Sequence, residues 1–114
     1  MPDKDERPWG KYEVVAAENG AKAKRIEVYP GKRLSLQKHH QRAEKWIVMT
    51  GRGMVTVGSR QWEVGPGSFI EVACGEIHRM HNTGNAPLVF VEVQFGDYLG
   101  EDDIIRLEDD FGRK

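Results

Sequence analysis

The sequence predicts an all-β fold, a small barrel or sandwich of short strands, from three observations. Turn-forming residues recur about every 8–14 residues along most of the chain. The runs between them are short and rich in β-branched and aromatic residues, and no window before residue 98 shows a helical period of 3.6. Many short strands at this spacing are typical of all-β sandwiches and barrels.

Six runs between the turn signals are predicted strands. In order, they are Tyr12–Val15, Lys24–Val28, Lys45–Met49, Met54–Val57, Ser68–Val72 and Leu88–Phe95. The last run alternates most clearly and places Glu92 and Gln94 on the same face as Leu88 and Phe90. A carboxylate and an amide on an apolar face predict an interior that is partly polar.

Two further segments carry structural expectations. The run from Lys45 to Met49 is apolar on both faces, with Trp46 on one and Ile47 on the other. We therefore expect the second sheet or a partner subunit to cover each side of this strand. The C-terminal segment 100–114 is compatible with a short helix around Asp102–Asp109, with Asp102 as its cap.

Composition excludes several classes of protein. The 114 residues and 13.0 kDa predict one domain, 1–114. Seventeen basic and eighteen acidic side chains give a net charge of −1, so we expect neither nucleic-acid nor membrane binding. The single cysteine, Cys74, excludes an intramolecular disulfide. The charged segment 1–10 is unlike a signal peptide and no apolar run could span a bilayer, which predicts a cytoplasmic location.

Residues that could carry chemistry fall in two segments, 31–51 and 67–82. The first holds Gln37 and His39, which would leave the same face of a strand. A tight turn after His39 would return the chain antiparallel and place Glu44 beside it. In the second segment, His78 is expected at the mouth of another strand or turn.

The predicted donor set consists of one amide, two imidazoles and one carboxylate, from Gln37, His39, Glu44 and His78. Such nitrogen and oxygen donors without a thiolate suit Zn, Mn, Fe, Co or Ni. Four protein ligands of this kind leave coordination positions open to water or substrate, as in catalytic sites. The sequence therefore predicts one divalent metal ion in a catalytic centre.

The glycines, the four donors and Asn82 fall in register with the two motifs of the cupin superfamily. Gln37 departs from that pattern, since many cupins have histidine there, and Ala73 replaces the usual proline. The flanking sequence is similar to the type II phosphomannose isomerase domain, the C-terminal part of bifunctional mannose-1-phosphate guanylyltransferase/mannose-6-phosphate isomerases. The resemblance covers residues 7–113 and rests on the stretches Arg7–Gly10, Pro30–Gly31, Leu34–His40, Arg42–Glu44 with Trp46, Glu92–Gln94 and Tyr98–Arg106.

The resemblance implies a double-stranded β-helix, a small jelly-roll barrel, which is expected to form a homodimer. It implies a metal-dependent isomerase that interconverts mannose 6-phosphate and fructose 6-phosphate through a cis-enediol, in carbohydrate and polysaccharide precursor metabolism. Zn is the first metal expected, with Mn, Co, Ni or Fe as alternatives. No Gly-rich loop leading into a helix is visible, so we expect no nucleotidyltransferase activity.

An aldose–ketose isomerase needs a base for the carbon-bound proton and a cation for the phosphate. Arg106, in the family-like stretch, is the first candidate for contact with the substrate or its phosphate. Arg42 and Arg79, each near a predicted metal ligand, are the second candidates. Glu92 and His81 are the candidates for the catalytic base, because burial could tune either toward neutral pH.

Two other classes of function remain open. The same open coordination would serve another metal-dependent cupin enzyme, such as a dioxygenase, which would need a redox metal and oxygen. A sugar-binding or regulatory cupin would bind sugar phosphate without converting it. Metal and oxygen requirements separate the first alternative from an isomerase, and a turnover assay separates the second.

Overall fold

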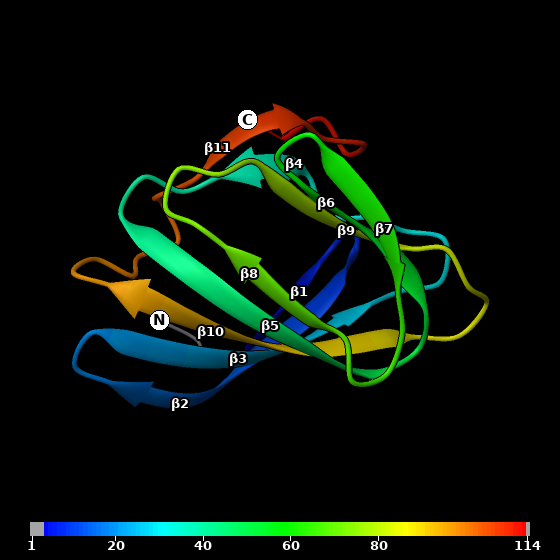
Figure 1. Cartoon of the computed structure of the whole chain (residues 1–114), viewed down its shortest axis with the longest axis horizontal. Coiled ribbons are helices and arrows are strands. Elements are labelled where there is room, and N and C mark those ends of the chain that lie inside the picture. The colour runs from blue at the N-terminus through cyan, green and yellow to red at the C-terminus, as the bar shows by residue number, and fades with distance from the viewer. Residues whose placement is uncertain (1–3, 114) are drawn as a thin grey trace.

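The computed structural model describes residues 4–113, and all regular secondary structure in that range is β (Figure 1). The strands are β1 (Lys4–Arg7), β2 (Gly10–Glu18), β3 (Ala21–Val28), β4 (Leu36–Lys38), β5 (Arg42–Thr50), β6 (Gly53–Val57), β7 (Arg60–Val64), β8 (Phe69–Val72), β9 (His78–Asn82), β10 (Leu88–Gly96) and β11 (Ile105–Glu108). Five of the six predicted runs lie within these strands and the sixth, Ser68–Val72, begins one residue before β8, which confirms the all-β prediction. No helix in the described range is long and apolar enough to cross a membrane.

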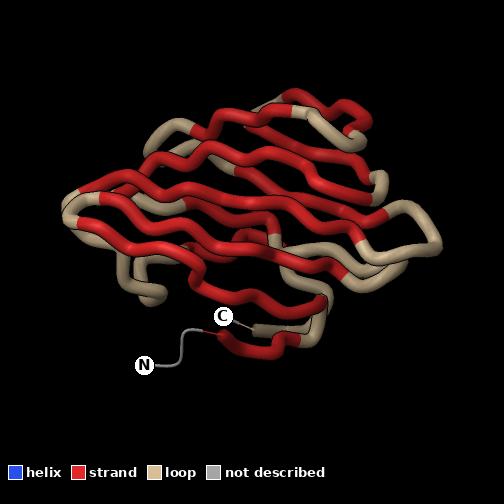
Figure 2. The backbone as a smooth tube through the Cα atoms, turned by 90° about the horizontal axis from the view of Figure 1, so that it is seen from below, coloured by secondary structure: helices blue, strands red, loops and turns tan. Residues whose placement is uncertain are grey.

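The strands form two sheets, and every named strand pair is antiparallel. One sheet has the order β1-β2-β3-β10-β5-β8 and the other has the order β11-β4-β9-β6-β7. Figure 2 shows the strands of both sheets stacked across the molecule, with loops closing its two ends. Neighbours such as β3 and β10 are distant in sequence, so the chain winds repeatedly from one sheet to the other.

The space between the sheets is apolar at one end and polar at the other. Val28, Val48 and Phe90 are buried in the apolar core. Farther along β10, Glu92 and Gln94 point to the same side and are also buried. The predicted partly polar interior is therefore confirmed, and the polar part collects titratable groups in a place sheltered from water.

Strand pairing sets these interior polar side chains in rows, because directly opposed residues share a face. Across the first sheet, Glu92 lies opposite Lys24 on β3 and opposite Trp46 on β5. Across the second sheet, Gln37 lies opposite His78 on β9 and opposite Arg106 on β11. Each sheet thus presents one polar row to the interior.

The predicted helix around Asp102–Asp109 is wrong. A turn at its start leads into β11, and Ile105 pairs with Lys38 while Glu108 pairs with Leu36 at the edge of the second sheet. This pairing satisfies the backbone of an otherwise open sheet edge, and tertiary contacts override the local helical preference.

One expectation about the strands around the first motif needs correction, and another stays a prediction. His39 lies just after β4, and β4 and β5 belong to different sheets, so the chain crosses between layers instead of forming a hairpin. Trp46 is buried as expected, and within this chain nothing covers the opposite face of β5, so cover by a partner subunit stays a prediction. Ile47 and Met49 are 47% and 54% exposed there, beside Phe69 of β8.

Candidate metal centre and adjoining pocket

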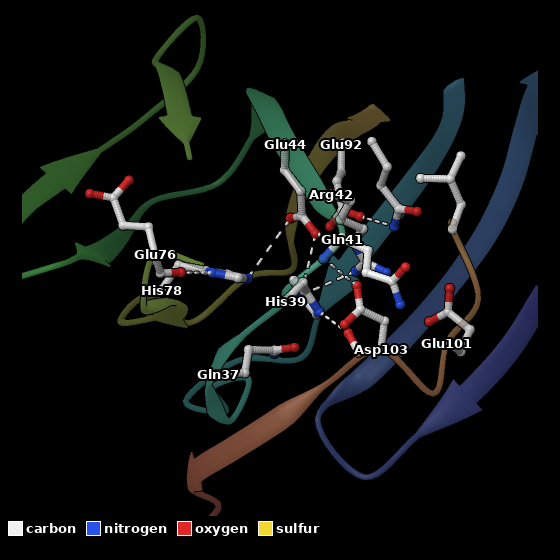
Figure 3. Close-up of polar contacts among 12 residues, drawn as sticks. Gln37, His39, Gln41, Arg42, Glu44, Glu76, His78, Glu92, Glu101 and Asp103 are labelled. Carbon is white, nitrogen blue, oxygen red and sulfur yellow. Dashed lines mark hydrogen bonds and ion pairs between the residues drawn. The ribbon is translucent and has the colours of Figure 1, made fainter. Parts of the chain in front are cut away.

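Three of the four predicted metal ligands meet between the sheets. The Glu44 carboxylate lies between two imidazoles, with Oε2 3.3 Å from His39 Nε2 and Oε1 3.9 Å from His78 Nε2 (Figure 3). One donor atom from each of the three residues lies within 4.8 Å of the others. All three side chains are at least 96% buried. The expectation that Glu44 lies beside His39 is therefore confirmed.

Both imidazoles are held in the tautomer that a metal ligand needs. His39 Nδ1 donates to the Asp103 carbonyl at 2.5 Å, and His78 Nδ1 donates to the Glu76 carbonyl at 2.9 Å. The Nε2 lone pairs are left facing Glu44. A hydrogen bond from the second ring nitrogen is the usual support of a metal-binding histidine. Burial lowers the pKa of His39 to about 4, and the nearby charge of Arg42 adds to this effect although Glu44 opposes it. The ring is therefore neutral.

Glu44 is held as a carboxylate despite its burial. Desolvation alone would raise its pKa. The pKa is instead lowered to about 2 by electrostatic interaction with His78, Arg42 and His39 and by a hydrogen bond from Trp46. Arg42 Nε donates to Oε2 at 2.7 Å and Trp46 Nε1 donates to Oε1 at 2.9 Å. Arg42 Nη2 also lies 3.1 Å from His39 Nε2. The cluster therefore already attracts a cation, and a divalent ion would compete with this guanidinium.

The loop that carries His39 is fixed by two distant segments. The Asp103 carboxylate accepts the backbone N–H groups of His40 and Gln41 at 3.0 and 2.9 Å. The Gly75 N–H donates to the His39 carbonyl at 2.7 Å, from a turn where the φ of +79° favours glycine. The glycine of the second motif thus supports a ligand of the first.

Gln37, the fourth predicted ligand, reaches the same region from β4. It lies directly opposite His78, so the two side chains leave the same face of the second sheet. Its amide nitrogen donates to the Ser35 carbonyl at 3.3 Å. The amide oxygen is the atom that would bind a metal, in keeping with the predicted donor set.

A pocket adjoins the cluster and contains several of the predicted site residues. Its lining is formed by Arg7, Trp9, Tyr12, Lys24, Ile26, Leu34, Ser35, Gln37, Arg42, Glu92, Glu101, Ile104, Arg106 and Arg113. Five of these side chains are cationic and two are acidic. Within the described chain, Arg42 Nη1 and Ser35 Oγ are buried without a hydrogen-bond partner. Orphaned polar atoms and excess positive charge point to a polar, anionic ligand.

Glu92 lines this pocket, and of the two candidates for the catalytic base it is the one that does so. It is 6% exposed and accepts a hydrogen bond from the Gln94 amide. Burial, followed by the negative charge of Glu44, raises its pKa to about 7, although Lys24 and Arg42 oppose the shift. A carboxyl group with this pKa can exchange protons at neutral pH.

Arg106 also lines the pocket, opposite Gln37 in the second sheet. Burial and the neighbouring guanidiniums of Arg113 and Arg7 lower its pKa, whereas Asp109 raises it. Arg113 donates to Asp109 through Nε and Nη2, both at 2.9 Å. Positive groups drawn from β1, β11 and the C-terminal segment therefore crowd one side of the pocket.

Two predicted site residues lie elsewhere. On β9, Arg79 and His81 point to the face opposite that of His78 and so face away from the cluster. Arg79 donates to the Leu34 carbonyl at 2.9 Å and to Glu108 at 2.6 Å, which fastens the C-terminal strand. Neither residue lines the pocket, so we assign neither of them a part in catalysis or substrate binding.

Residues missed from the sequence complete the pocket. Arg7, Lys24, Glu101 and Arg113 lie far from both motifs in the chain, and Asp103 supports His39 from the C-terminal segment. Lys24 carried one usable signal, because a lysine interrupts the apolar positions of a predicted strand that continues to Ile26 and Val28.

The residues present fit a divalent metal ion. Two imidazoles whose Nε2 atoms face Glu44, one ionised carboxylate and one adjacent amide give a mixed nitrogen and oxygen donor set. The protein binds both Nδ1 atoms through backbone carbonyls, and Arg42 shares Glu44 Oε2 and His39 Nε2, so an incoming ion would displace the guanidinium from these atoms. The centre can therefore hold an ion and still present it to a ligand in the pocket.

Comparison with known proteins gives a consistent result. The family described as "Mannose-6-phosphate isomerase C-terminal" matches residues 2–109. The alginate biosynthesis protein AlgA of Pseudomonas aeruginosa is 47% identical over 107 residues, which are 94% of this chain and 22% of AlgA. The mannose-1-phosphate guanylyltransferase ManC of Salmonella typhimurium is 44% identical over the same share of this chain and 22% of its own. The chain thus spans less than a quarter of these relatives.

Solved structures establish the fold. A Klebsiella pneumoniae protein with a double-stranded β-helix domain superposes with a TM-score of 0.78 at 20% identity, covering 92% of this chain and 90% of that one. Oxalate decarboxylase from Lactobacillus farciminis gives a TM-score of 0.79 at 22% identity, over 91% of this chain and 33% of that one. The fold is therefore the double-stranded β-helix that the resemblance implies.

Proposed function

The chain belongs to the mannose-6-phosphate isomerase C-terminal family, and from that premise we propose that it interconverts mannose 6-phosphate and fructose 6-phosphate. The main support is the buried cluster of His39, Glu44 and His78, which lies beside a pocket rich in cationic side chains. A metal-dependent isomerase of sugar phosphates needs both features, the cluster for the ion and the cations for the phosphate. Its relatives AlgA and XanB are named for alginate and xanthan biosynthesis, which supports a role in polysaccharide precursor metabolism.

We propose that Gln37, His39, Glu44 and His78 hold one divalent ion, with Zn as the first choice and Mn, Co, Ni or Fe also compatible with the donors. When bound, the ion would supply Lewis-acid stabilisation of the negative charge that develops on the sugar oxygens. Glu92 would remove the proton from C2 of the open-chain sugar and return it to C1, through a cis-enediol. Its position in the pocket and its pKa of about 7 suit this role.

The phosphate would lie among the arginines of the pocket. Arg106 is flanked by Arg7 and Arg113, and this crowding of like charge is relieved when an anion binds. Arg42 serves the ligand cluster through its bonds to Glu44 and His39. We therefore assign the phosphate contact to Arg106 and the shaping of the metal centre to Arg42.

Replacing Arg106 by glutamine is expected to raise the KM for mannose 6-phosphate by roughly 10–100-fold, because a charge-assisted contact is lost. The kcat value should change less. Steady-state kinetics would measure both, with Arg60→Gln as the control, since Arg60 stacks on Trp62 in β7 and does not line the pocket. An unchanged KM would remove Arg106 from the phosphate contact.

The proposed function is tested with metal-stripped protein and added Zn, Mn or Co, by coupling fructose 6-phosphate formation to a second enzyme. Turnover that depends on the added metal and proceeds without oxygen supports the isomerase. Binding of sugar phosphate without turnover under every metal would favour a sugar-binding module. A requirement for oxygen and a redox metal would favour another class of metal-dependent enzyme.

We propose no nucleotidyl transfer for this chain. The relatives named as guanylyltransferases are more than four times as long as the matched region. A phosphate-binding Gly-rich loop opening a helix is absent from residues 4–113, which contain no helix.

We also propose a homodimer formed through the open face of β5 and β8. Ile47, Met49 and Phe69 are each about half exposed on this face, and Ile47 lies directly opposite Phe69. Exposed apolar clusters of this kind mark protein interfaces. A second copy would cover the side of β5 that this chain leaves open.

Ile47→Lys is expected to weaken the dimer by about 100-fold, because a charge would enter the centre of the apolar face. Sedimentation velocity over a range of concentrations would measure the change. Val15→Lys, at a position 55% exposed on β2, is the matched control and should leave the assembly unchanged. A monomeric parent protein at all concentrations would refute the dimer.

A further inference from the structure

Lys24 is a buried lysine that the roles assigned so far do not use. It is 4% exposed, lies on the inner face of β3 and lines the pocket. Directly across the strand pair stands Glu92, so the two side chains share the pocket floor. Lysine is seldom fully buried without a specific purpose or partner, which directs attention to what this ammonium contacts.

The contacts of Lys24 hold its ammonium in place. Nζ donates to Glu101 at 2.5 Å and lies 4.4 Å from the centre of the Tyr12 ring. Lys24 is the first of the attractive charges that lower the pKa of Glu101 against the opposing effect of burial. An ammonium has three donors, and Glu101 accepts one of them. Within residues 4–113, no other hydrogen bond from Lys24 is found, so the remaining donors can serve a ligand in the pocket.

Aldose–ketose isomerisation moves two protons, not one. The first passes from C2 to C1, and the second passes from the oxygen on C2 to the oxygen on C1. Glu92 is placed for the carbon-bound proton, and the oxygen-bound proton needs a second group that can both give and accept it. Arginine cannot release a proton in proteins, so the four arginines of the pocket are excluded: Arg7, Arg42, Arg106 and Arg113. Lys24 is the remaining cation of the inner pocket wall.

We propose that Lys24, held by Glu101, is the catalytic residue that transfers the proton between the two sugar oxygens. This inference rests on the proposed isomerase function. As the Glu92 carboxylate takes the proton from C2, the Lys24 ammonium gives one to the oxygen on C1, and the C1–C2 double bond of the enediol forms. Lys24, now an amine, then takes the proton from the hydroxyl on C2, while Glu92 returns its proton to C1. Both groups end in their starting states, so the cycle needs no other reactant.

The test compares three variants at one fixed metal. Lys24→Met keeps most of the side-chain length and removes the ammonium. Lys24→Arg keeps the charge but cannot release a proton. Lys22→Met is the matched control, because Lys22 also contacts the C-terminal segment, at 2.8 Å from the Leu99 carbonyl and 3.6 Å from Glu101, but does not line the pocket. Thermal melting of each variant establishes that it is folded.

Both Lys24 variants are expected to lower kcat by about 100-fold or more, with KM within about threefold of the parent value. In D2O, the ratio of deuterium exchange at C2 to product formation should rise, because Glu92 still removes the carbon-bound proton. Lys22→Met should retain the parent kcat.

Three outcomes would overturn the assignment. Activity near the parent value in Lys24→Met would show that the ammonium is dispensable. Recovery in Lys24→Arg would show that charge alone suffices. An equal loss in Lys22→Met would trace the effect to docking of the C-terminal segment. A parent protein inactive with every metal would refute the isomerase and this inference together, whereas an active parent with an active Lys24→Met would refute the inference alone.

Discussion

A chain with alanine in place of both His39 and His78 is expected to lose metal binding and isomerase activity together. The two imidazoles supply the nitrogen donors, and their Nε2 atoms converge on Glu44. Removing both should weaken divalent-ion binding by at least ~100-fold, since the loss of even a supporting hydrogen bond costs 10–100-fold. Activity should fall by roughly 10³-fold, because charge developing on the sugar oxygens is no longer neutralised.

Metal affinity would be measured by competition with a chelator, and activity by the coupled assay. His81→Ala is the control, because His81 lies on the opposite face of β9 and should retain both properties. Unchanged metal affinity in the double variant would show that the ion is held elsewhere. A loss of activity with retained affinity would limit the two histidines to a role in positioning the substrate.

Glu92→Gln is expected to lower kcat by roughly 10²–10⁴-fold, the usual contribution of a general base. Glutamine keeps the shape of the side chain and cannot accept the proton from C2. In the parent protein, activity should rise with pH through about 7, because the carboxylate is the active form and the pKa of Glu92 is raised to about 7. Glu71→Gln, on the exposed end of a surface ion pair with Lys45, should leave the profile unchanged.

The same carboxyl group predicts the pH dependence of stability. Its pKa is 4.5 in an ordinary setting and about 7 in the fold, so the folded chain binds the extra proton between these values. The stabilisation from this proton is complete below about 4.5 and is lost as the pH rises through 7. Glu92→Gln should therefore gain stability relative to the parent at pH 8, as measured by thermal melting. The quantity to compare is the melting temperature of the variant minus that of the parent. If this difference is no larger at pH 8 than at pH 5, the raised pKa is contradicted.

The sequence predicted the fold class well because strand period and turn chemistry are local signals. In β10, simple alternation separated Glu92 and Gln94 from Val91 and Val93, and the first pair is buried whereas the valines are half-buried. The C-terminal segment failed because its strand exists through pairing with β4, more than 60 residues away in the chain. No local pattern reveals such a partner, and the acidic cap signal at Asp102 favoured the wrong element.

The candidate site was predictable where the motif itself carried the geometry. The spacing of the motif places His39 in a loop and Glu44 and His78 near the starts of two strands, so these three residues meet. The prediction of the base and the arginines depended instead on which face of a strand each side chain leaves. His81 and Arg79 were misplaced, since a shift of one residue along a strand moves a side chain to the other face. Lys24 and Glu101 were missed because residues 77 apart meet only after both sheets are assembled.

The support of His39 by Asp103 has a consequence for biosynthesis. The two residues are 64 positions apart, and Asp103 orients the ring through its carbonyl while its carboxylate fixes the adjoining loop. A ribosome must therefore have released nearly the whole domain before the ligand sphere can be finished. During translation the incomplete chain would lack the finished donor set, so any ion that this site takes up would bind only after the barrel is complete.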